Sequence, residues 1–193
     1  GAGSTAPTRS RRSDGAARGV ERLGPRLWRA ETRDGRGLTL REIRPGDAPA
    51  LQRAFAAQAA EDRKLRLLSS IPRLPDRMAQ RFCTVDGVRD FALVWIPEDA
   101  PDALAGGARL MRDAGAETRA EFAVSVASHL KGHGLGRKAL ETVMELGAEN
   151  GIAQVWGSVS RANAGMRALA KTLGMSERPD PDDPSLVIVE RAI

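Results

Sequence analysis

The sequence predicts an α/β fold in which helices cover a mixed β-sheet. The continuously apolar segment 91–96 is typical of a central strand that is covered on both faces. Segment 120–126 instead alternates between bulky apolar residues and small or polar ones, as expected of a half-buried strand. Segment 135–150 carries an apolar stripe at helical spacing and stops at Gly151, where glycine commonly ends a helix.

The remaining elements follow from the same signals of apolar spacing and turn residues. The predicted strands are residues 38–44, 104–111, 153–159 and 186–189, and the predicted helices are residues 47–58, 74–82 and 163–173. Asp47 stands at the N-cap position of the first helix. The resulting order is β-α-α-β-β-β-α-β-α-β, which is typical of one α/β domain.

Residues 1–36 are predicted to form a disordered, arginine-rich tail, and residues 37–193 to form the folded domain. The first 37 residues hold nine arginines against four acidic residues, which accounts for the whole net charge of +5. The rest of the chain is neutral and offers few aromatic side chains for stacking on bases. Nucleic-acid binding is therefore not favoured, and a role of that kind would depend on the tail and on low salt.

The composition also favours a cytoplasmic protein without a membrane span. Cys83 is the one cysteine of the chain, so no internal disulfide is expected, and its apolar neighbours predict burial. We find no apolar stretch long enough to cross a bilayer and no apolar core of a secretory signal. His129 and His133 lack partners at metal-ligand spacing, so no metal site is expected.

The segment KGHGLGR at residues 131–137 connects a predicted strand to a predicted helix. Its three glycines allow close approach of the backbone to a ligand and let several N–H groups point the same way. Because a helix begins here, its dipole also favours an anion, which indicates a pyrophosphate site. The spacing matches neither a P-loop nor the dinucleotide-binding fingerprint. A glycine-rich turn without a ligand is the alternative.

This segment resembles the Q/R-x-x-G-x-G/A motif of the GNAT superfamily of N-acyltransferases, with Lys131 in place of the usual Gln or Arg. Asn163 and the helix that ends in Leu173-Gly174-Met175 resemble the family's Asn-containing helix ending in Gly-Phe. The resemblance spans roughly residues 38–191. It implies the GNAT fold, with a mixed, mostly antiparallel sheet of roughly six to seven strands and about four flanking helices.

Three further segments look most like bacterial protein-lysine acetyltransferase domains. They are LREIRPGD at 40–47, the segment from Arg77 to Phe82, and AEFAV at 120–124. The resemblance implies acetyl-CoA as cosubstrate. The cofactor-binding residues that it implies are Val124, Val126, Lys131, Gly132, His133, Gly134, Gly136, Arg137 and Asn163.

Within this set the implied roles differ. Backbone N–H groups of the loop would hold the pyrophosphate of CoA, and the strand that contains Val124 and Val126 would pair with the pantetheine arm. Asn163 would form a hydrogen bond with that arm from the next helix. Its alternative role is the N-cap of the following helix, and the two roles are compatible.

Acyl transfer to an amine needs a neutral nucleophile, and Glu121 is the predicted general base. A lysine-like amine of pKa ~10.4 is deprotonated about once in 2,500 molecules at pH 7, which adds ~4.6 kcal/mol to the barrier. Glu121 lies on the face opposite Phe122, and the resemblance implies a strand glutamate in this role. An exposed strand charge is the alternative. The backbone N–H of Val124 is the expected oxyanion donor.

The chain has no Tyr, so the general acid of many GNAT enzymes is absent, and Ala170 stands at the matching position. A thiol of pKa ~8.5 leaves without protonation, so catalysis remains possible. The predicted acceptor is a protein lysine. A small amine and a non-catalytic acyl-CoA sensor are the alternatives. Acceptor specificity is assigned to segments 59–75 and 177–184, and the oligomeric state is left open.

Overall fold

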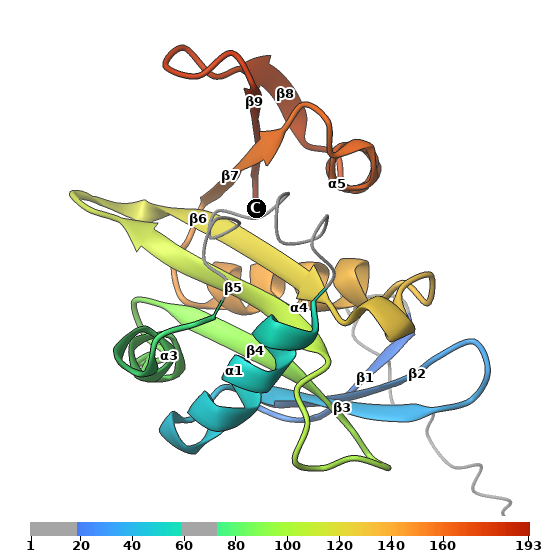
Figure 1. Cartoon of the computed structure of the whole chain (residues 1–193). Coiled ribbons are helices and arrows are strands. Elements are labelled where there is room, and N and C mark those ends of the chain that lie inside the picture. Colours follow the sequence, from blue (N-terminus) through green and yellow to red (C-terminus); the bar gives the residue numbers. More distant parts are fainter. Residues whose placement is uncertain (1–18, 59–72) are drawn as a thin grey trace, which may run out of the picture.

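The computed structural model describes residues 19–58 and 73–193, which form one nine-stranded sheet with helices on its faces (Figure 1). The strand order is β1-β2-β3-β4-β5-β6-β7-β9-β8. All neighbouring strands are antiparallel except β6 and β7. The strands are β1 (Val20–Gly24), β2 (Leu27–Glu31), β3 (Gly37–Glu42), β4 (Phe91–Pro97), β5 (Gly106–Asp113), β6 (Ala116–Val126), β7 (Gln154–Ser160), β8 (Ser176–Pro179) and β9 (Leu186–Ala192). The predicted mixed, mostly antiparallel α/β fold is confirmed.

Four α-helices occur within the described residues, as predicted. They are α1 (Ala48–Ala57), α3 (Asp76–Cys83), α4 (Leu135–Glu149) and α5 (Ala164–Thr172), with short 3-10 turns η1 (Pro45–Asp47) and η2 (Ser128–Leu130). Figure 1 shows α1 and α3 in front of the sheet and α4 behind it. All ten elements expected from the sequence are present, each within a few residues of its predicted bounds.

Strand β4 separates two apolar cores. Its residues Phe91, Leu93 and Trp95 pack into the larger core with α4, and the alternate residues Ala92 and Val94 pack into the smaller core with α1 and α3. All seven residues of β4 are buried. The prediction of a central strand covered on both faces is therefore confirmed, and the burial of Cys83 in the smaller core is confirmed as well.

Three strands were not predicted, and the expectation of disorder for residues 1–36 is wrong for segment 20–31. These residues form β1 and β2, which extend the sheet beyond β3. Ion pairs to distant acids hold their arginines, as between Arg22 and Glu149 at 2.7 Å, so the arginine-rich composition misled the prediction. The third strand, β8, is exposed along its length and shows no alternation. Residues 1–18 of the predicted tail lie outside the described residues.

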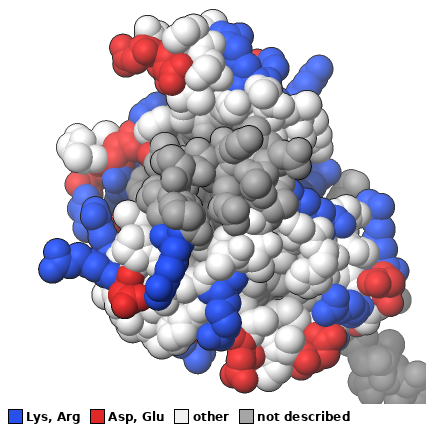
Figure 2. All heavy atoms as spheres, in the orientation of Figure 1, with Lys and Arg blue, Asp and Glu red and all other residues white. Residues whose placement is uncertain are grey.

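Charges of both signs are interspersed around the face drawn in Figure 2, with no large area of one sign on its described part. Surface ion pairs account for part of this mixing, as between Arg89 and Glu117 at 2.8 Å. The longest described helix, α4, has 15 residues, and none of the described helices has the length and apolar character needed to cross a membrane.

Candidate functional site

The sheet splits between its two parallel strands. Strands β6 and β7 pair at three positions, and the last of these joins Glu121 to Trp156. Beyond it, residues 122–126 of β6 pair with β5 on one side and have no ladder partner in β7. About half of the backbone N–H and C=O groups of such a segment point away from the paired neighbour. The split therefore offers unpaired backbone groups to an extended ligand.

The glycine loop lies between the end of β6 and the start of α4. Gly132 and Gly134 have φ angles of +87° and +73°, and a Cβ atom at either position would meet no heavy atom within 4 Å. The first turn of α4 begins its hydrogen bonding at Lys138, whose N–H donates to the carbonyl of Gly134 at 3.0 Å. The preceding amides of α4 thus have no acceptor within the helix. The loop is open, and its N–H groups are available to an anion.

Side chains of β6 hold the start of α4 against the sheet. A Cβ atom at Gly136 would lie 3.3 Å from Val126 Cγ2 and 3.7 Å from Val124 Cγ2, so glycine allows the helix to approach this strand closely. Both valines pack against the larger core. Both remain partly exposed, and their side chains position the loop.

The charged and aromatic side chains of the loop are engaged by protein groups. Arg137 forms an ion pair with Glu141 at 2.8 Å, and His133 Nδ1 accepts a hydrogen bond from the Arg33 N–H at 3.2 Å. The Lys131 N–H donates to the Ser128 carbonyl at 3.4 Å. The residues predicted to bind pyrophosphate are therefore brought together, and what they offer is mainly backbone N–H. Open backbone amides at a helix N-terminus fit a phosphate group.

Asn163 caps α5 on the opposite side of the split. Its Oδ1 accepts the Met166 N–H at 3.0 Å, which is a helix N-cap interaction. The N-cap alternative is therefore confirmed. An amide that accepts through oxygen keeps its NH₂ group as a donor, so the structure leaves the second predicted role of Asn163 open.

Glu121 lies where the split begins, and its carboxylate is half-buried. Among the described residues, no hydrogen-bond or ion-pair partner contacts this carboxylate. Burial raises the pKa of Glu121, the negative charge of Asp113 raises it further, and the positive charge of Arg119 opposes both. A carboxylate without bonded partners and with a raised pKa is suited to accept a proton.

Two other carboxylates lie on the same face of the sheet, and both are engaged. Asp113 pairs with Arg119 at 2.5 Å and accepts the Trp156 Nε1–H at 2.9 Å. Glu190 lies 3.6 Å from the same arginine. The Glu190 carboxylate also accepts hydrogen bonds from Arg178 at 3.2 Å and from Gln154 at 3.3 Å. Glu121 is therefore the acid of the three that is free to exchange a proton.

The sequence analysis missed Asp113 and Trp156, because no motif joins residues of three separate strands.

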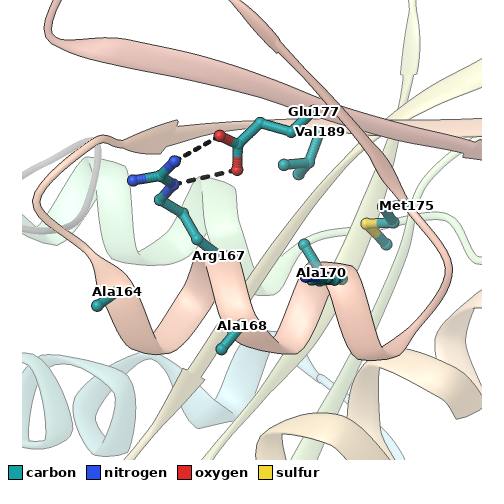
Figure 3. A pocket seen from close by; sticks show the side chains of 8 residues that line it. Ala164, Arg167, Ala168, Ala170, Met175, Glu177 and Val189 are labelled. Carbon is teal, nitrogen blue, oxygen red and sulfur yellow. Dashed lines mark hydrogen bonds and ion pairs between the residues drawn. The ribbon is translucent and has the colours of Figure 1, made fainter.

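A hollow of about 540 Å³ lies between α5 and the strands β8 and β9 (Figure 3). The ion pair between Arg167 and Glu177, at 2.6 Å, crosses it. Ala170, which by resemblance stands at the position of the tyrosine acid, is buried beside this hollow. The acidic segment 177–184 was expected to be a loop, but its first three residues belong to β8 and pair with β9. The remainder shows local bonds, as from the Ser185 N–H to Asp183 at 2.9 Å, which are typical of a solvated turn. Most of segment 59–75 lies outside the described residues.

Within residues 19–58 and 73–193, no three His, Cys, Asp or Glu side chains gather in a way that would hold a metal ion.

Comparison with known proteins places this geometry in context. The family model of the acetyltransferase (GNAT) domain matches residues 37–176. An acetyltransferase of Pseudomonas aeruginosa is 25% identical over 166 residues, which cover 86% of this chain and 89% of the relative.

Solved structures show the same fold. The GNAT domain of PAT from S. lividans superimposes with a TM-score of 0.77 at 23% identity, over 86% of this chain and 96% of that one. RimJ of Mycobacterium smegmatis, in complex with CoA-disulfide, gives a TM-score of 0.64 at 18% identity, over 86% of each chain. A cAMP-binding acyltransferase of the same organism gives 0.59 at 24% identity, over 86% of this chain and 46% of that one.

Proposed function

The chain belongs to the acetyltransferase (GNAT) domain family and is an acyltransferase, and we propose that it moves the acetyl group of acetyl-CoA to a primary amine. The acceptor that we propose is a protein lysine, with Glu121 as general base. The observation that carries this proposal is the half-buried carboxylate of Glu121, without a bonded partner in the described part of the chain, at the point where β6 and β7 separate.

The described residues fit acetyl-CoA as cosubstrate. The loop amides from Gly132 to Arg137 would hold the pyrophosphate, since they are open and begin a helix. Unpaired backbone groups of residues 122–126 would bond the pantetheine arm as a further strand would. The NH₂ group of Asn163 would add one donor. That RimJ of Mycobacterium smegmatis has this fold in complex with CoA-disulfide supports the assignment.

In the proposed reaction, Glu121 first takes a proton from the acceptor ammonium and so makes the amine nucleophilic. The amine nitrogen then attacks the thioester carbon, a C–N bond forms, and the C–S bond breaks. The Val124 N–H is the proposed donor to the oxygen that becomes negative. The second amine proton is lost to water, and the sulfur leaves as a thiolate without a tyrosine acid, since the corresponding thiol has a pKa of ~8.5.

The charge around Glu121 supports a cationic acceptor. Arg109, which also lies on this face, is engaged by the carbonyl and the ring of Phe82. The ionic cluster beside Glu121 holds three carboxylates and two arginines, so it carries one net negative charge. Its members are Asp113, Glu121, Glu190, Arg119 and Arg178. A protonated amine balances that charge, and the likeness of segments 40–47 and 120–124 to protein-lysine acetyltransferase domains favours a lysine side chain.

The test is acetyl-CoA turnover, followed as free thiol, with a panel of lysine peptides and small amines, beside calorimetric binding of acetyl-CoA. Turnover with lysine peptides supports the whole proposal. Turnover confined to small amines retains the chemistry and replaces the acceptor. Binding without turnover favours an acyl-CoA sensor, which Ala170 in place of tyrosine makes the second candidate. Absence of binding overturns the proposal.

A further inference from the structure

The turn between β2 and β3 lies against the glycine loop, although the two segments are about a hundred residues apart in sequence. The Arg33 N–H donates to His133 Nδ1 at 3.2 Å. One turn into α4, Lys138 Nζ donates to the Glu31 carbonyl at 3.3 Å. These contacts place the β2–β3 turn, a part of the chain expected to be disordered, directly beside the amides that fit a phosphate.

The turn itself is held by its own hydrogen bonds. The Thr32 N–H donates to the Arg36 carbonyl at 2.8 Å, and the Gly35 N–H donates to the Thr32 carbonyl at 3.0 Å. The Arg36 N–H also donates to the Thr32 hydroxyl at 2.9 Å, and Thr32 is buried. Gly35 has a φ of +87°, a conformation that glycine adopts without strain. The backbone of Arg33 is therefore fixed at the corner of an ordered turn.

The guanidinium of Arg33 differs from those of neighbouring arginines. Arg29 pairs with Glu98 at 2.6 Å, and Arg36 pairs with Asp99 at 3.3 Å. Arg33 is exposed, and within the described part of the chain no acceptor contacts its guanidinium. The adjacent Asp34 carboxylate instead accepts the hydroxyl of Thr32. A long, flexible cation thus stands beside the loop without an anionic partner.

The contact between Arg33 and His133 also determines which hydrogen-bonding groups the loop presents on the side of the β2–β3 turn. Because Nδ1 accepts the Arg33 N–H, the neutral ring carries its proton on Nε2 and offers that atom only as a donor. The loop amides are donors as well. Every group described at this edge of the loop except the carboxylate of Asp34 therefore favours an anion.

We propose that Arg33 binds a phosphate group of CoA, either the pyrophosphate on the loop or the 3′-phosphate of the adenosine. This inference rests on the proposed use of acetyl-CoA. A guanidinium matches phosphate oxygens with two parallel N–H donors, which a backbone amide cannot do. The β2–β3 turn then supplies a side-chain cation to a site whose other donors are mainly backbone N–H.

The test is isothermal titration calorimetry of the full chain with acetyl-CoA and with 3′-dephospho-CoA. We expect Arg33→Ala to weaken acetyl-CoA binding about tenfold, as loss of a charged hydrogen bond on a partly solvated surface. Arg33→Lys is expected to recover part of this loss, because it retains the charge without the fork. The matched control is Arg29→Ala, which removes an arginine of β2 that is already paired, and is expected to bind as the wild type does.

Each outcome decides a point. A loss that appears with acetyl-CoA but not with 3′-dephospho-CoA assigns Arg33 to the 3′-phosphate, and an equal loss with both ligands assigns it to the pyrophosphate. Unchanged affinity for both ligands in a folded Arg33→Ala protein overturns the inference while the proposed function stands. A wild-type protein that binds neither ligand overturns the proposed function itself. Thermal unfolding of each variant establishes that the fold is retained.

Discussion

Glu121 on β6 lies opposite Trp156 on β7 at the last position where these parallel strands pair. The indole Nε1–H of Trp156 donates to Asp113, and Arg119 stacks on the indole ring with its Cζ 4.7 Å from the ring centroid. The paired end of the split is thus a fixed aromatic and ionic cluster, whereas the carboxylate of Glu121 stands beside it without a bonded partner among the described residues.

Replacing the proposed base tests its role directly. Glu121→Gln keeps the shape of the side chain but cannot take a proton, so we expect kcat to fall about 10²- to 10⁴-fold. Acetyl-CoA affinity, measured by calorimetry, is expected to stay unchanged. Glu117→Gln is the matched control, because Glu117 lies on the same strand but is paired with Arg89 on the surface. Equal turnover in both variants would refute the assignment.

The pH dependence of kcat/KM reports the environment of Glu121. Its pKa lies above the ordinary value of 4.5, chiefly through burial and then through the charge of Asp113. The base works only when deprotonated, so activity falls as the pH drops through this raised pKa. Asp113→Asn removes the negative charge and leaves Arg119 less neutralised, and both changes lower the pKa of Glu121. We expect the acid limb of the profile to move to lower pH. A limb that moves upward, or not at all, contradicts this account.

Two substitutions separate the roles of Asn163. Asn163→Asp retains an oxygen that accepts the Met166 N–H, so α5 keeps its cap. It lacks the NH₂ donor, so we expect several-fold weaker acetyl-CoA binding with unchanged resistance to urea. Asn163→Ala loses both interactions and is expected to cost about 1 kcal/mol of unfolding free energy. If the aspartate variant binds acetyl-CoA as tightly as the wild type, Asn163 is a helix cap alone.

The conformation of the loop depends on Gly134. Its φ of +73° lies in the left-handed region, and a Cβ atom there would meet no heavy atom within 4 Å, so the cost of Gly134→Ala is one of backbone strain. We expect a loss of about 1–2 kcal/mol in unfolding free energy and weaker acetyl-CoA binding, because relaxation of the strain displaces the amides. Gly46→Ala is the control, since Gly46 is equally open but lacks a positive φ. Equal stability and binding in the two variants would count against the strained loop.

The ion pair between Arg41 and Asp47 at the start of α1 is expected to stabilise the folded protein. Arg41 donates to both oxygens of Asp47 at 2.8 and 2.9 Å, and the Arg44 N–H adds a bond of 2.7 Å. Burial alone would raise the pKa of Asp47, but these bonds outweigh it and hold the pKa below the ordinary 3.8. We expect Asp47→Ala to lose about 2 kcal/mol of unfolding free energy at neutral pH.

The sign of the pH dependence checks that prediction. A carboxyl with a lowered folded pKa stabilises the protein above its unfolded pKa, and this contribution is lost as the pH falls through the folded value. The difference between wild type and Asp47→Ala is therefore expected to shrink below pH 3.8 in urea unfolding series. A difference that stays constant across this range would show that packing, not ionisation, is what the substitution removes.

The sequence alone determined the elements whose patterns are local. The alternation in 120–126 and the apolar run in 91–96 identified the strands that contain Glu121 and separate the two cores. The glycines of loop 131–137 identified a turn with open amides, because positive φ angles at Gly132 and Gly134 are a property of glycine itself. Each of these features depends on neighbouring residues, so it can be read along the chain.

Tertiary structure decided what depends on distant partners. Strands β1 and β2 form because Trp28 is buried and because arginines such as Arg22 meet acids far along the chain, and composition alone could not show this. Likewise, Asp113, Trp156 and Glu121 become one cluster only when three strands are aligned. Charge and burial act through space rather than along the chain, so the raised pKa of Glu121 and the place of Arg33 beside the loop appear only in the folded protein.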